Sequence, residues 1–187
     1  MIGQSNHIPS ESDLIRGCID GNRQMQKMLY QMYSSKMYGV CLRYSENADD
    51  ANDILQEGFI KVYKNINKFR SEGSFEGWIR RIFINTSIEH FRKKIKFNNI
   101  SEIHENTIED ESIDVFNSLS AKDIIKAIDQ LSPGYKTVFN MHVIEGYSHK
   151  EIADILDITE GTSKSQLARA KGILKKILAT SISNSKK

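Results

Sequence analysis

The sequence predicts an all-α protein built from two small helical domains, an N-terminal helical bundle and a C-terminal helix-turn-helix domain, joined by an acidic flexible linker. Apolar residues recur at helical spacing through most of residues 13–96, without a useful stretch of period-two alternation. Residues 131–178 contain helical patterns separated by a tight polar turn. Between these parts, residues 99–120 contain no Lys or Arg. We therefore predict domains over 1–98 and 121–187, separated by a linker over 99–120.

Composition and charge fit this division. Of the 187 residues, 39% are hydrophobic and 27% are charged, which is typical of a folded globular chain. Residues 1–98 carry 15 Lys and Arg against 11 Asp and Glu, and residues 121–187 carry 11 against 7. Because the linker has no sustained helical or strand period, it is either a solvated spacer or a segment suited to a basic channel on a partner. Its six acidic residues are Glu102, Glu105, Glu109, Asp110, Glu111 and Asp114.

Four helical patterns make up the predicted N-terminal bundle, over residues 13–21, 23–44, 48–67 and 75–96. Polar residues separate them, and Pro9 stands before the first, where a helix breaker does least harm. The spacing therefore predicts a compact bundle whose helices are joined by short connections.

Carboxylates form a stripe along the third predicted helix. Asp49, Asp53 and Glu57 recur every four residues, with Asp50 beside them, so they share one face. We interpret this stripe as a docking face. Two alternatives stay open: a solvated face in which Glu57 pairs with Lys61, and a divalent-metal site for phosphoryl transfer. The opposite side is apolar and predicts a core face: Ala51, Ile54, Leu55, Phe59 and Val62.

Aromatic and cationic side chains are interleaved around the fourth predicted helix. Residues 68–98 carry eight Lys and Arg against three Glu, which suits a phosphate backbone, and exposed rings could stack on unpaired bases. The alternative is that Trp78, Ile82 and Phe83 belong to the bundle core. The segment includes Phe69, Arg70, Phe75, Trp78, Arg80, Arg81, Phe83, Asn85, His90, Phe91, Arg92, Lys93 and Lys94.

The C-terminal domain contains a predicted helix-turn-helix. Ser148 and Glu151 have the spacing of a capping box, so a helix starts at this point. Residues 157–159 then form a polar turn around Ile158, and Thr159 can cap a second helix that begins at Glu160. Pro133 stands at the start of this helical unit.

The second of these helices has an apolar face and a basic face. Leu167, Ala170, Leu174 and Ile177 recur at spacings of three and four. The outer residues can neutralise phosphates and bond base edges in a major groove, or they form an ordinary solvated basic face. These outer residues are Lys164, Ser165, Gln166, Ala168, Arg169 and Lys171.

Several other protein classes are disfavoured. Cys18 and Cys41 lie within helical patterns, which is typical of core thiols in a reduced protein and not of disulfides or a zinc site. The chain does not open with a signal segment, and no apolar run approaches the length of a membrane span. We therefore expect a cytoplasmic protein without membrane insertion. The five His residues are scattered, and we expect no metal and no cofactor.

Together these motifs resemble the extracytoplasmic-function (ECF) group of bacterial sigma factors, over nearly the whole chain. In the first half the resemblance rests on DDANDILQEGFIKVY at 49–63, on Phe69 and Arg70, and on FEGWIRRIFIN at 75–85. In the second half it rests on LSP at 131–133, YSHKEIADIL at 147–156 and EGTSKSQLARA at 160–170.

The resemblance implies a promoter-specificity subunit that is not itself an enzyme. Its first domain would dock on the clamp helices of the largest subunit of core RNA polymerase and would melt the minus-ten element. A base flipped from the nontemplate strand would be captured by the 69–75 loop, at an unstacking cost of a few kcal/mol. The implied polymerase-binding residues are Asp49, Asp50, Asp53, Gln56 and Glu57. The implied minus-ten DNA-binding residues are Lys61, Asn65, Phe69, Arg70, Ser74, Phe75, Trp78, Arg80, Arg81, Asn85, Arg92 and Lys93.

The second domain would read the minus-thirty-five element of promoter DNA and contact the flap region of polymerase, while the linker follows the RNA-exit path. The resemblance also implies that an anti-sigma factor can hold the protein. The implied minus-thirty-five DNA-binding residues are Thr162, Lys164, Ser165, Gln166, Ala168, Arg169 and Lys171.

Two residues depart from the family pattern. Ser163 stands where members commonly have Val, at a position expected to half face the core, so looser helix packing is expected there. Gln166 stands where they commonly have Arg, which leaves the DNA contact at this position open. The main alternative function is a stand-alone helix-turn-helix regulator, which would need no docking stripe and usually dimerises. A metal-dependent nuclease using Asp49, Asp50, Asp53 and Glu57 is a third.

Overall fold

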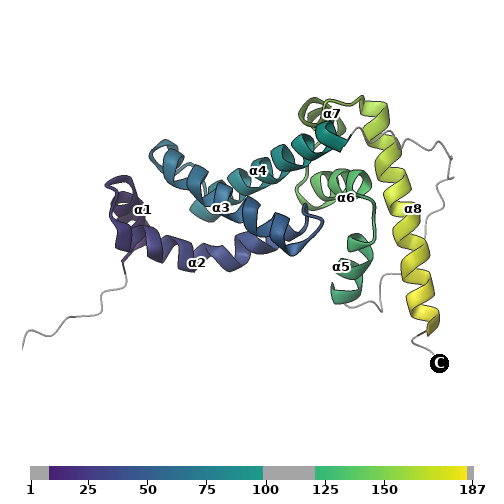
Figure 1. Cartoon of the computed structure of the whole chain (residues 1–187), viewed down its shortest axis with the longest axis horizontal. Helices are drawn as coiled ribbons and strands as arrows, with labels where there is room; N and C mark the ends of the chain where they lie inside the picture. The colour runs from purple at the N-terminus through teal and green to yellow at the C-terminus, as the bar shows by residue number, and fades with distance from the viewer. Residues whose placement is uncertain (1–8, 99–120, 185–187) are drawn as a thin grey trace, which may run out of the picture. The chain divides into compact units, whose positions relative to one another are not determined.

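The computed structural model describes residues 9–98 and 121–184, and all regular structure within them is helical (Figure 1). The predicted all-α fold class is therefore confirmed. The predicted linker, 99–120, lies outside the described residues. The chain separates into two compact units that divide between His90 and Phe91.

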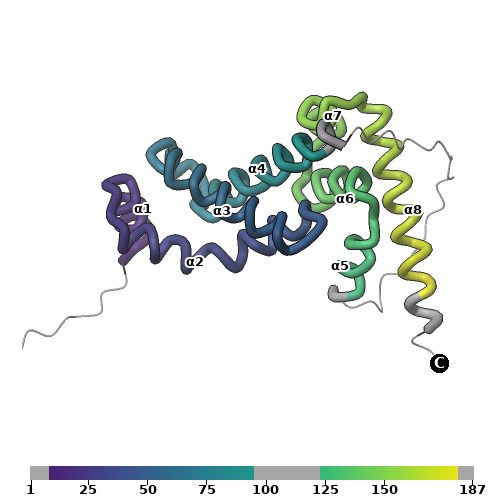
Figure 2. Tube along the Cα trace, in the orientation of Figure 1, coloured from purple at the N-terminus to yellow at the C-terminus, as the bar shows by residue number. Residues whose placement is uncertain are grey.

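The first unit contains α1, α2, α3, one 3₁₀ turn (η1) and the part of α4 up to His90, and α4 continues past the division (Figures 1 and 2). Their bounds agree with the predicted patterns to within a few residues, except that the end of the third pattern tightens into η1. The elements are α1 (Glu11–Ile19), α2 (Arg23–Leu42), α3 (Ala48–Asn65), η1 (Ile66–Lys68) and α4 (Phe75–Asn98).

Side-chain caps fix where these helices begin. Ser10 and Asp13 form a capping box at α1, and the Asn22 side chain accepts from backbone N–H groups at the start of α2. At α3, Asn47 Oδ1 accepts from the Asp50 N–H at 2.8 Å. Each cap satisfies backbone donors that a helix leaves without intrahelical partners, so the polar breaks in the sequence define the helix boundaries.

The core of the first unit is formed largely by the apolar face of α3 and by facing residues of α2 and α4. The predicted core residues of α3 are at most 7% exposed, as are Leu29 and Phe83. A Cβ atom on Gly58 would lie only 2.3 Å from the Phe83 ring, so glycine allows α3 and α4 to approach closely. Both predicted core thiols are buried, and burial raises the pKa of the Cys41 thiol to about 12.

The second unit places its longest helix against the others (Figure 1). Its elements are α5 (Ala121–Asp129), α6 (Pro133–Phe139), a π-helical segment η3 (Asn140–Ile144), α7 (His149–Leu156) and α8 (Glu160–Asn184). One core cluster joins α5 and the adjoining turn to α8 through Ala127, Leu131, Ala170, Leu174 and Leu178.

The predicted helix-turn-helix is confirmed as α7 and α8. The Ser148 N–H donates to Glu151 Oε2 at 2.8 Å, and the Glu151 N–H donates to Ser148 Oγ at 3.2 Å, which completes the capping box. Asp157 then ends α7 in the left-handed region, at φ 60°. The Thr162 N–H donates to Thr159 Oγ1 at 3.0 Å, so Thr159 caps α8 as predicted.

Candidate nucleic-acid interface

The carboxylate stripe on α3 faces away from the core, but its members differ in their surroundings. Asp49, Asp53 and Gln56 are exposed, whereas Asp50 and Glu57 are half-buried. The Asn47 amide donates to Asp50 Oδ2 at 3.3 Å, so Asp50 belongs to the helix cap. Asp49, Asp53 and Gln56 are therefore the stripe residues most accessible to a docking partner.

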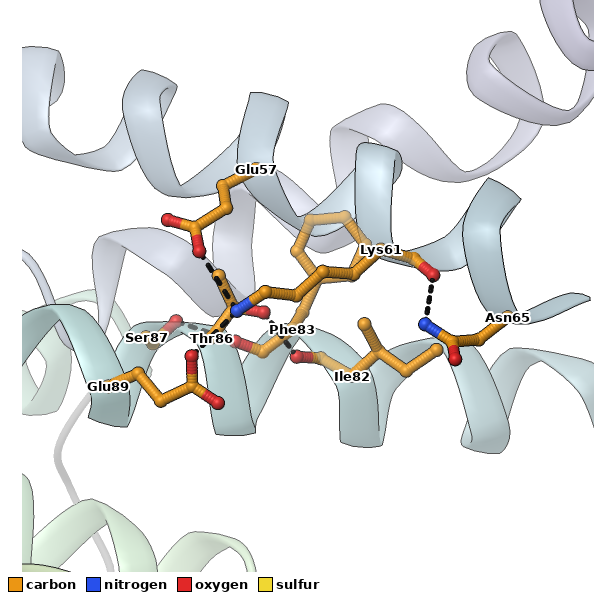
Figure 3. A network of polar contacts seen from close by, with 8 residues as sticks. All are labelled: Glu57, Lys61, Asn65, Ile82, Phe83, Thr86, Ser87 and Glu89. Carbon is orange, nitrogen blue, oxygen red and sulfur yellow. Dashed lines mark hydrogen bonds and ion pairs between the residues drawn. The ribbon is translucent and has the colours of Figure 1, made fainter.

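Next to the stripe, Lys61 connects α3 to α4 through a network of polar contacts (Figure 3). Its Nζ lies 2.9 Å from Glu57 Oε1 and 2.7 Å from Glu89 Oε2. Burial acts to lower the pKa of Lys61, but the hydrogen bonds to Glu89 and Glu57 outweigh it, so the pKa is raised. Asn65 Nδ2 donates to the Lys61 carbonyl oxygen at 2.9 Å. Lys61 is thus a cation fixed in place by two carboxylates. One of these, Glu89, was not among the residues predicted from the sequence.

Three rings gather where the 69–75 loop meets α4. Ring centroids lie 5.1 Å apart between Phe69 and Phe75, 5.7 Å between Phe69 and Trp78, and 5.8 Å between Phe75 and Trp78. Phe75 is 0% exposed, while Phe69 and Trp78 are half-buried. Phe75 therefore supports the other two rings, which keep surface that a base could stack on.

The remaining predicted residues of this surface lie in the 69–75 loop and along α4. Ser74 Oγ accepts from the Gly77 N–H at 3.1 Å and so caps α4, while Ser71 adopts a left-handed conformation at φ 57°. On α4, Arg81, Asn85 and Glu89 follow one another at spacings of four, so they share one helix face. Arg70, Arg81, Asn85 and Lys93 are exposed, and Arg80 and Arg92 are half-buried.

On α8, the predicted DNA-reading residues fall into two groups. Lys164, Ser165, Ala168 and Lys171 are exposed, whereas Thr162, Gln166 and Arg169 are half-buried. Arg169 Nη1 donates to the Tyr135 hydroxyl at 3.4 Å, and Gln166 Oε1 lies next to Gly134. These two side chains therefore lie on the flank of α8 that faces α6. Of the predicted core residues of α8, Leu167, Ala170 and Leu174 are buried, and Ile177 is half-buried against the core cluster.

Ser163 is fully buried rather than half-facing the core, and it has a polar partner. Its Oγ lies 2.9 Å from Nδ1 of His149, whose ring stacks on His142 at 4.3 Å between centroids and 12° between planes. His142 Nδ1 donates to the Tyr147 carbonyl oxygen at 2.8 Å. Burial lowers the pKa of His149, and the neighbouring His142 and Lys164 lower it further. The buried Ser163 hydroxyl thus has a hydrogen-bond partner on α7.

Comparison with known proteins identifies the family. Models of sigma-70 region 2 and of sigma-70 region 4 match residues 29–96 and 121–174. The ECF RNA polymerase sigma factor SigW of Bacillus subtilis is 31% identical over 167 residues, which are 80% of this chain and 87% of the relative. The chain belongs to the ECF sigma factors. The ECF sigma-E factor of Haemophilus influenzae is 27% identical over 177 residues, covering 88% of this chain and 93% of the relative.

A solved structure of the sigma factor RpoE from Bartonella quintana, in complex with the anti-sigma factor NepR, is 22% identical, with a TM-score of 0.48. It covers 82% of this sigma factor and 96% of the other chain.

Family membership makes this sigma factor a transcription-initiation factor whose partners are RNA polymerase and promoter DNA. Sigma factors as a family are non-catalytic. The region 2 match covers most of α2 and continues through α3 to α4, so it includes the carboxylate stripe, Lys61 and the aromatic rings. The region 4 match includes the helix-turn-helix.

Two findings concern the described part of this sigma factor only. None of its helices is both long enough and apolar enough to cross a bilayer. In the same residues, no group of three or more His, Cys, Asp or Glu side chains is arranged to hold a metal ion.

Proposed function

We propose that region 2 of this sigma factor docks on core polymerase and captures the nontemplate strand of the minus-ten element, while region 4 reads the duplex minus-thirty-five element. The observation that carries the proposal is the group of partly exposed Phe69 and Trp78 rings packed on buried Phe75, with Arg70 and Arg80 close to them in the sequence. Stacking rings beside cations are the chemistry by which proteins hold unpaired bases.

For docking, we propose that the exposed Asp49, Asp53 and Gln56 meet the clamp helices of the largest polymerase subunit. Glu57 and Asp50 would line the edge of this surface. An exposed acidic face on a capped, well-packed helix can meet a basic partner without first refolding, because α3 is already anchored by its buried side.

For the minus-ten element, we propose that a flipped base enters beside Phe69 and is read by Lys61, Asn65 and Asn85. Flipping costs a few kcal/mol, and stacking on an aromatic ring returns about 1 to 3 kcal/mol per base. Hydrogen bonds to the base edge would supply the remainder and the selectivity. The phosphates would be met by Arg70, Arg80, Arg81, Arg92 and Lys93, with Ser74 holding the loop end and Trp78 completing the stacking surface.

For the minus-thirty-five element, we propose that α8 enters the major groove with Lys164, Ser165, Ala168 and Lys171 foremost. Arg169 and Gln166 would approach the bases or phosphates from the flank beside α6, and Thr162 would contact the backbone near the start of α8. A duplex presents donors and acceptors in fixed positions, so an exposed helix face can read them directly.

We further propose the domain limits 1–98 and 121–187, with residues 99–120 lying along the RNA-exit path of polymerase. Region 4 would contact the flap, an anti-sigma factor would hold the free protein, and the protein would act in the cytoplasm.

Run-off transcription tests the proposal. Bacterial core polymerase is combined with the purified chain and a library of promoter fragments, and the start sites are sequenced. We expect specific initiation that requires both a minus-ten and a minus-thirty-five element. A chain that directs no specific start sites, and yet binds duplex DNA tightly without polymerase, would instead be a stand-alone regulator.

A further inference from the structure

We propose that Glu89 is a positioning residue for promoter reading: together with Glu57 it fixes the Lys61 ammonium between α3 and α4, so that Lys61 selects a base and does not simply attract phosphates. This inference rests on the proposed contact of Lys61 with the captured minus-ten base, and it adds a residue that the resemblance did not single out.

The contacts place one ammonium between two carboxylates from different helices (Figure 3). Glu57 precedes Lys61 by one helical turn on α3, whereas Glu89 reaches it from α4, 28 residues away in sequence. The Lys61 side chain is 29% exposed, compared with 60% for Lys36, which also pairs with a carboxylate of α4, Glu76. Lys61 is therefore held from two sides, while part of its side chain remains exposed to solvent.

Holding the side chain changes what the ammonium can do. A free lysine has four rotatable side-chain bonds, and fixing them on binding costs conformational entropy. In this network the Lys61 side chain is already fixed when region 2 folds, so DNA binding does not have to order it. An ammonium has three donors, and two are directed at Glu57 and Glu89, so the third is aimed in one direction. A donor with a fixed direction can distinguish one base edge from another.

The local charge points the same way. Within the network, two carboxylates offset the single ammonium, so Lys61 presents little net positive charge to a phosphate. The network is thus poorly suited to general phosphate binding, whereas a base edge is uncharged and needs no net positive charge. Glu89 also follows Asn85 by four residues, so the proposed base-reading amide and the carboxylate that holds Lys61 lie on one face of α4.

Holoenzymes carrying Glu89→Ala or Glu76→Ala provide a matched comparison. Each substitution removes one carboxylate of α4 that pairs with a lysine on another helix, and each introduces a good helix former. Binding is measured to four fork-junction promoter probes that differ only in the base at the captured position. Intact Trp78 fluorescence and helix content establish that each variant is folded.

For Glu89→Ala we expect the preference for the best base over the other three to fall by about three- to tenfold, which is the effect of losing about one hydrogen bond. The affinity for all four probes should rise or stay unchanged. Glu76→Ala should keep the wild-type preference. An unchanged preference in Glu89→Ala, whatever its affinity, overturns the inference, as does an equal loss in Glu76→Ala.

Lys61→Met separates failure of this inference from failure of the proposed function. It should reduce the base preference, and adding Glu89→Ala to it should cause no further loss, because the two residues act through one contact. If Lys61→Met lowers the preference and Glu89→Ala does not, the base contact stands and the positioning role falls. If Lys61→Met leaves the preference unchanged, the assigned contact of Lys61 is wrong, and the inference falls with it.

Discussion

Regions 2 and 4 of this sigma factor arrange their candidate DNA-binding side chains in different ways. In region 2 the important groups are tied across helices: Lys61 of α3 to Glu89 of α4, and Phe69 to rings at the start of α4. In region 4 the foremost cations project from one helix, and Lys164 pairs with Glu160 of the same helix at 3.5 Å. Region 2 is shaped by tertiary contacts, whereas the foremost cations of region 4 project from a single helix and Arg169, on its flank, is tied to Tyr135 of α6.

The difference follows from what each region is proposed to bind. A duplex presents a rigid groove, so a packed helix with exposed side chains is sufficient. An unpaired base has no rigid partner of its own, and the protein must supply a preformed platform to recover the unstacking energy. Substitutions in region 2 should therefore affect folding and binding together more often than substitutions on the exposed face of α8.

The largest expected effect separates polymerase docking from DNA reading. Reversing charge at Asp49 and Asp53 should weaken core binding by roughly 4 kcal/mol or more, because two exposed charges then repel the partner. Glu57 is left intact because it also holds Lys61. Affinity of the variant for a duplex minus-thirty-five probe should not change. Asp20→Arg, at the exposed residue that follows α1, is the control, and equal loss of polymerase and duplex binding would indicate a folding defect.

Substitutions of Phe75 and Phe69 test whether Phe75 supports the aromatic cluster while Phe69 contacts the captured base. Phe75→Ala should lower the free energy of unfolding of region 2 by about 3 to 5 kcal/mol, since the ring is completely buried. Phe69→Ala should cost much less stability and about 1 to 3 kcal/mol in binding to a single-stranded minus-ten probe. Urea unfolding followed by the fluorescence of Trp78, the chain's single tryptophan, measures stability. Equal stability losses in the two variants would contradict this division.

Substitution of Arg169 tests whether the flank of α8 that faces α6 contacts DNA. Arg169→Ala should cost about 1 to 3 kcal/mol in duplex binding, with relaxed specificity at one position if the side chain reads a base. Tyr135→Phe removes only the hydroxyl that accepts a hydrogen bond from Arg169, so it should weaken duplex binding by less, about 0.5 to 1.5 kcal/mol. Affinities for a set of single-base probe variants measure both quantities. A uniform loss across all sequences would make Arg169 a phosphate contact.

The smallest expected effect concerns pH. The pKa of His149 lies below its unfolded value of about 6.5, so the folded protein binds fewer protons than the unfolded chain as pH falls through that value. The stability of region 4 should therefore decrease as pH drops below about 6.5. Burial, His142, Lys164 and Lys171 all lower this pKa, while Glu160 opposes them.

Histidine ring proton shifts in the intact chain give the midpoint, and amide exchange in α7 and α8 gives the stability. A His149 midpoint above 6.5 would contradict the expected direction. His149→Gln should remove most of the dependence.

Local sequence patterns were enough to predict most of the fold. The capping box at Ser148, the cap at Thr159 and the apolar face of α3 all depend on residues within one or two helical turns, and each was confirmed. The structure also shows a π-helical segment at 140–144, which has an unusual hydrogen-bond register and was not anticipated.

The contacts that sequence reasoning missed join residues far apart in the chain. Glu89 meets Lys61 only because α3 and α4 pack closely at Gly58, and His149 meets Ser163 only because α7 turns back on α8. The division between buried Phe75 and partly exposed Phe69 depends on the same tertiary packing. Residue types and spacing indicated the region of the candidate interface, whereas the tertiary structure determines which of its side chains are held and which are accessible.

The division of labour between the two regions can be tested most directly by a crossed binding measurement with holoenzyme. Phe69→Ala and Arg169→Ala are each assayed on a single-stranded minus-ten probe and on a duplex minus-thirty-five probe. We predict that Phe69→Ala weakens binding to the single strand alone and that Arg169→Ala weakens binding to the duplex alone. If both variants weaken binding to the same probe, or if each weakens both equally, the proposed division between strand capture and duplex reading is wrong.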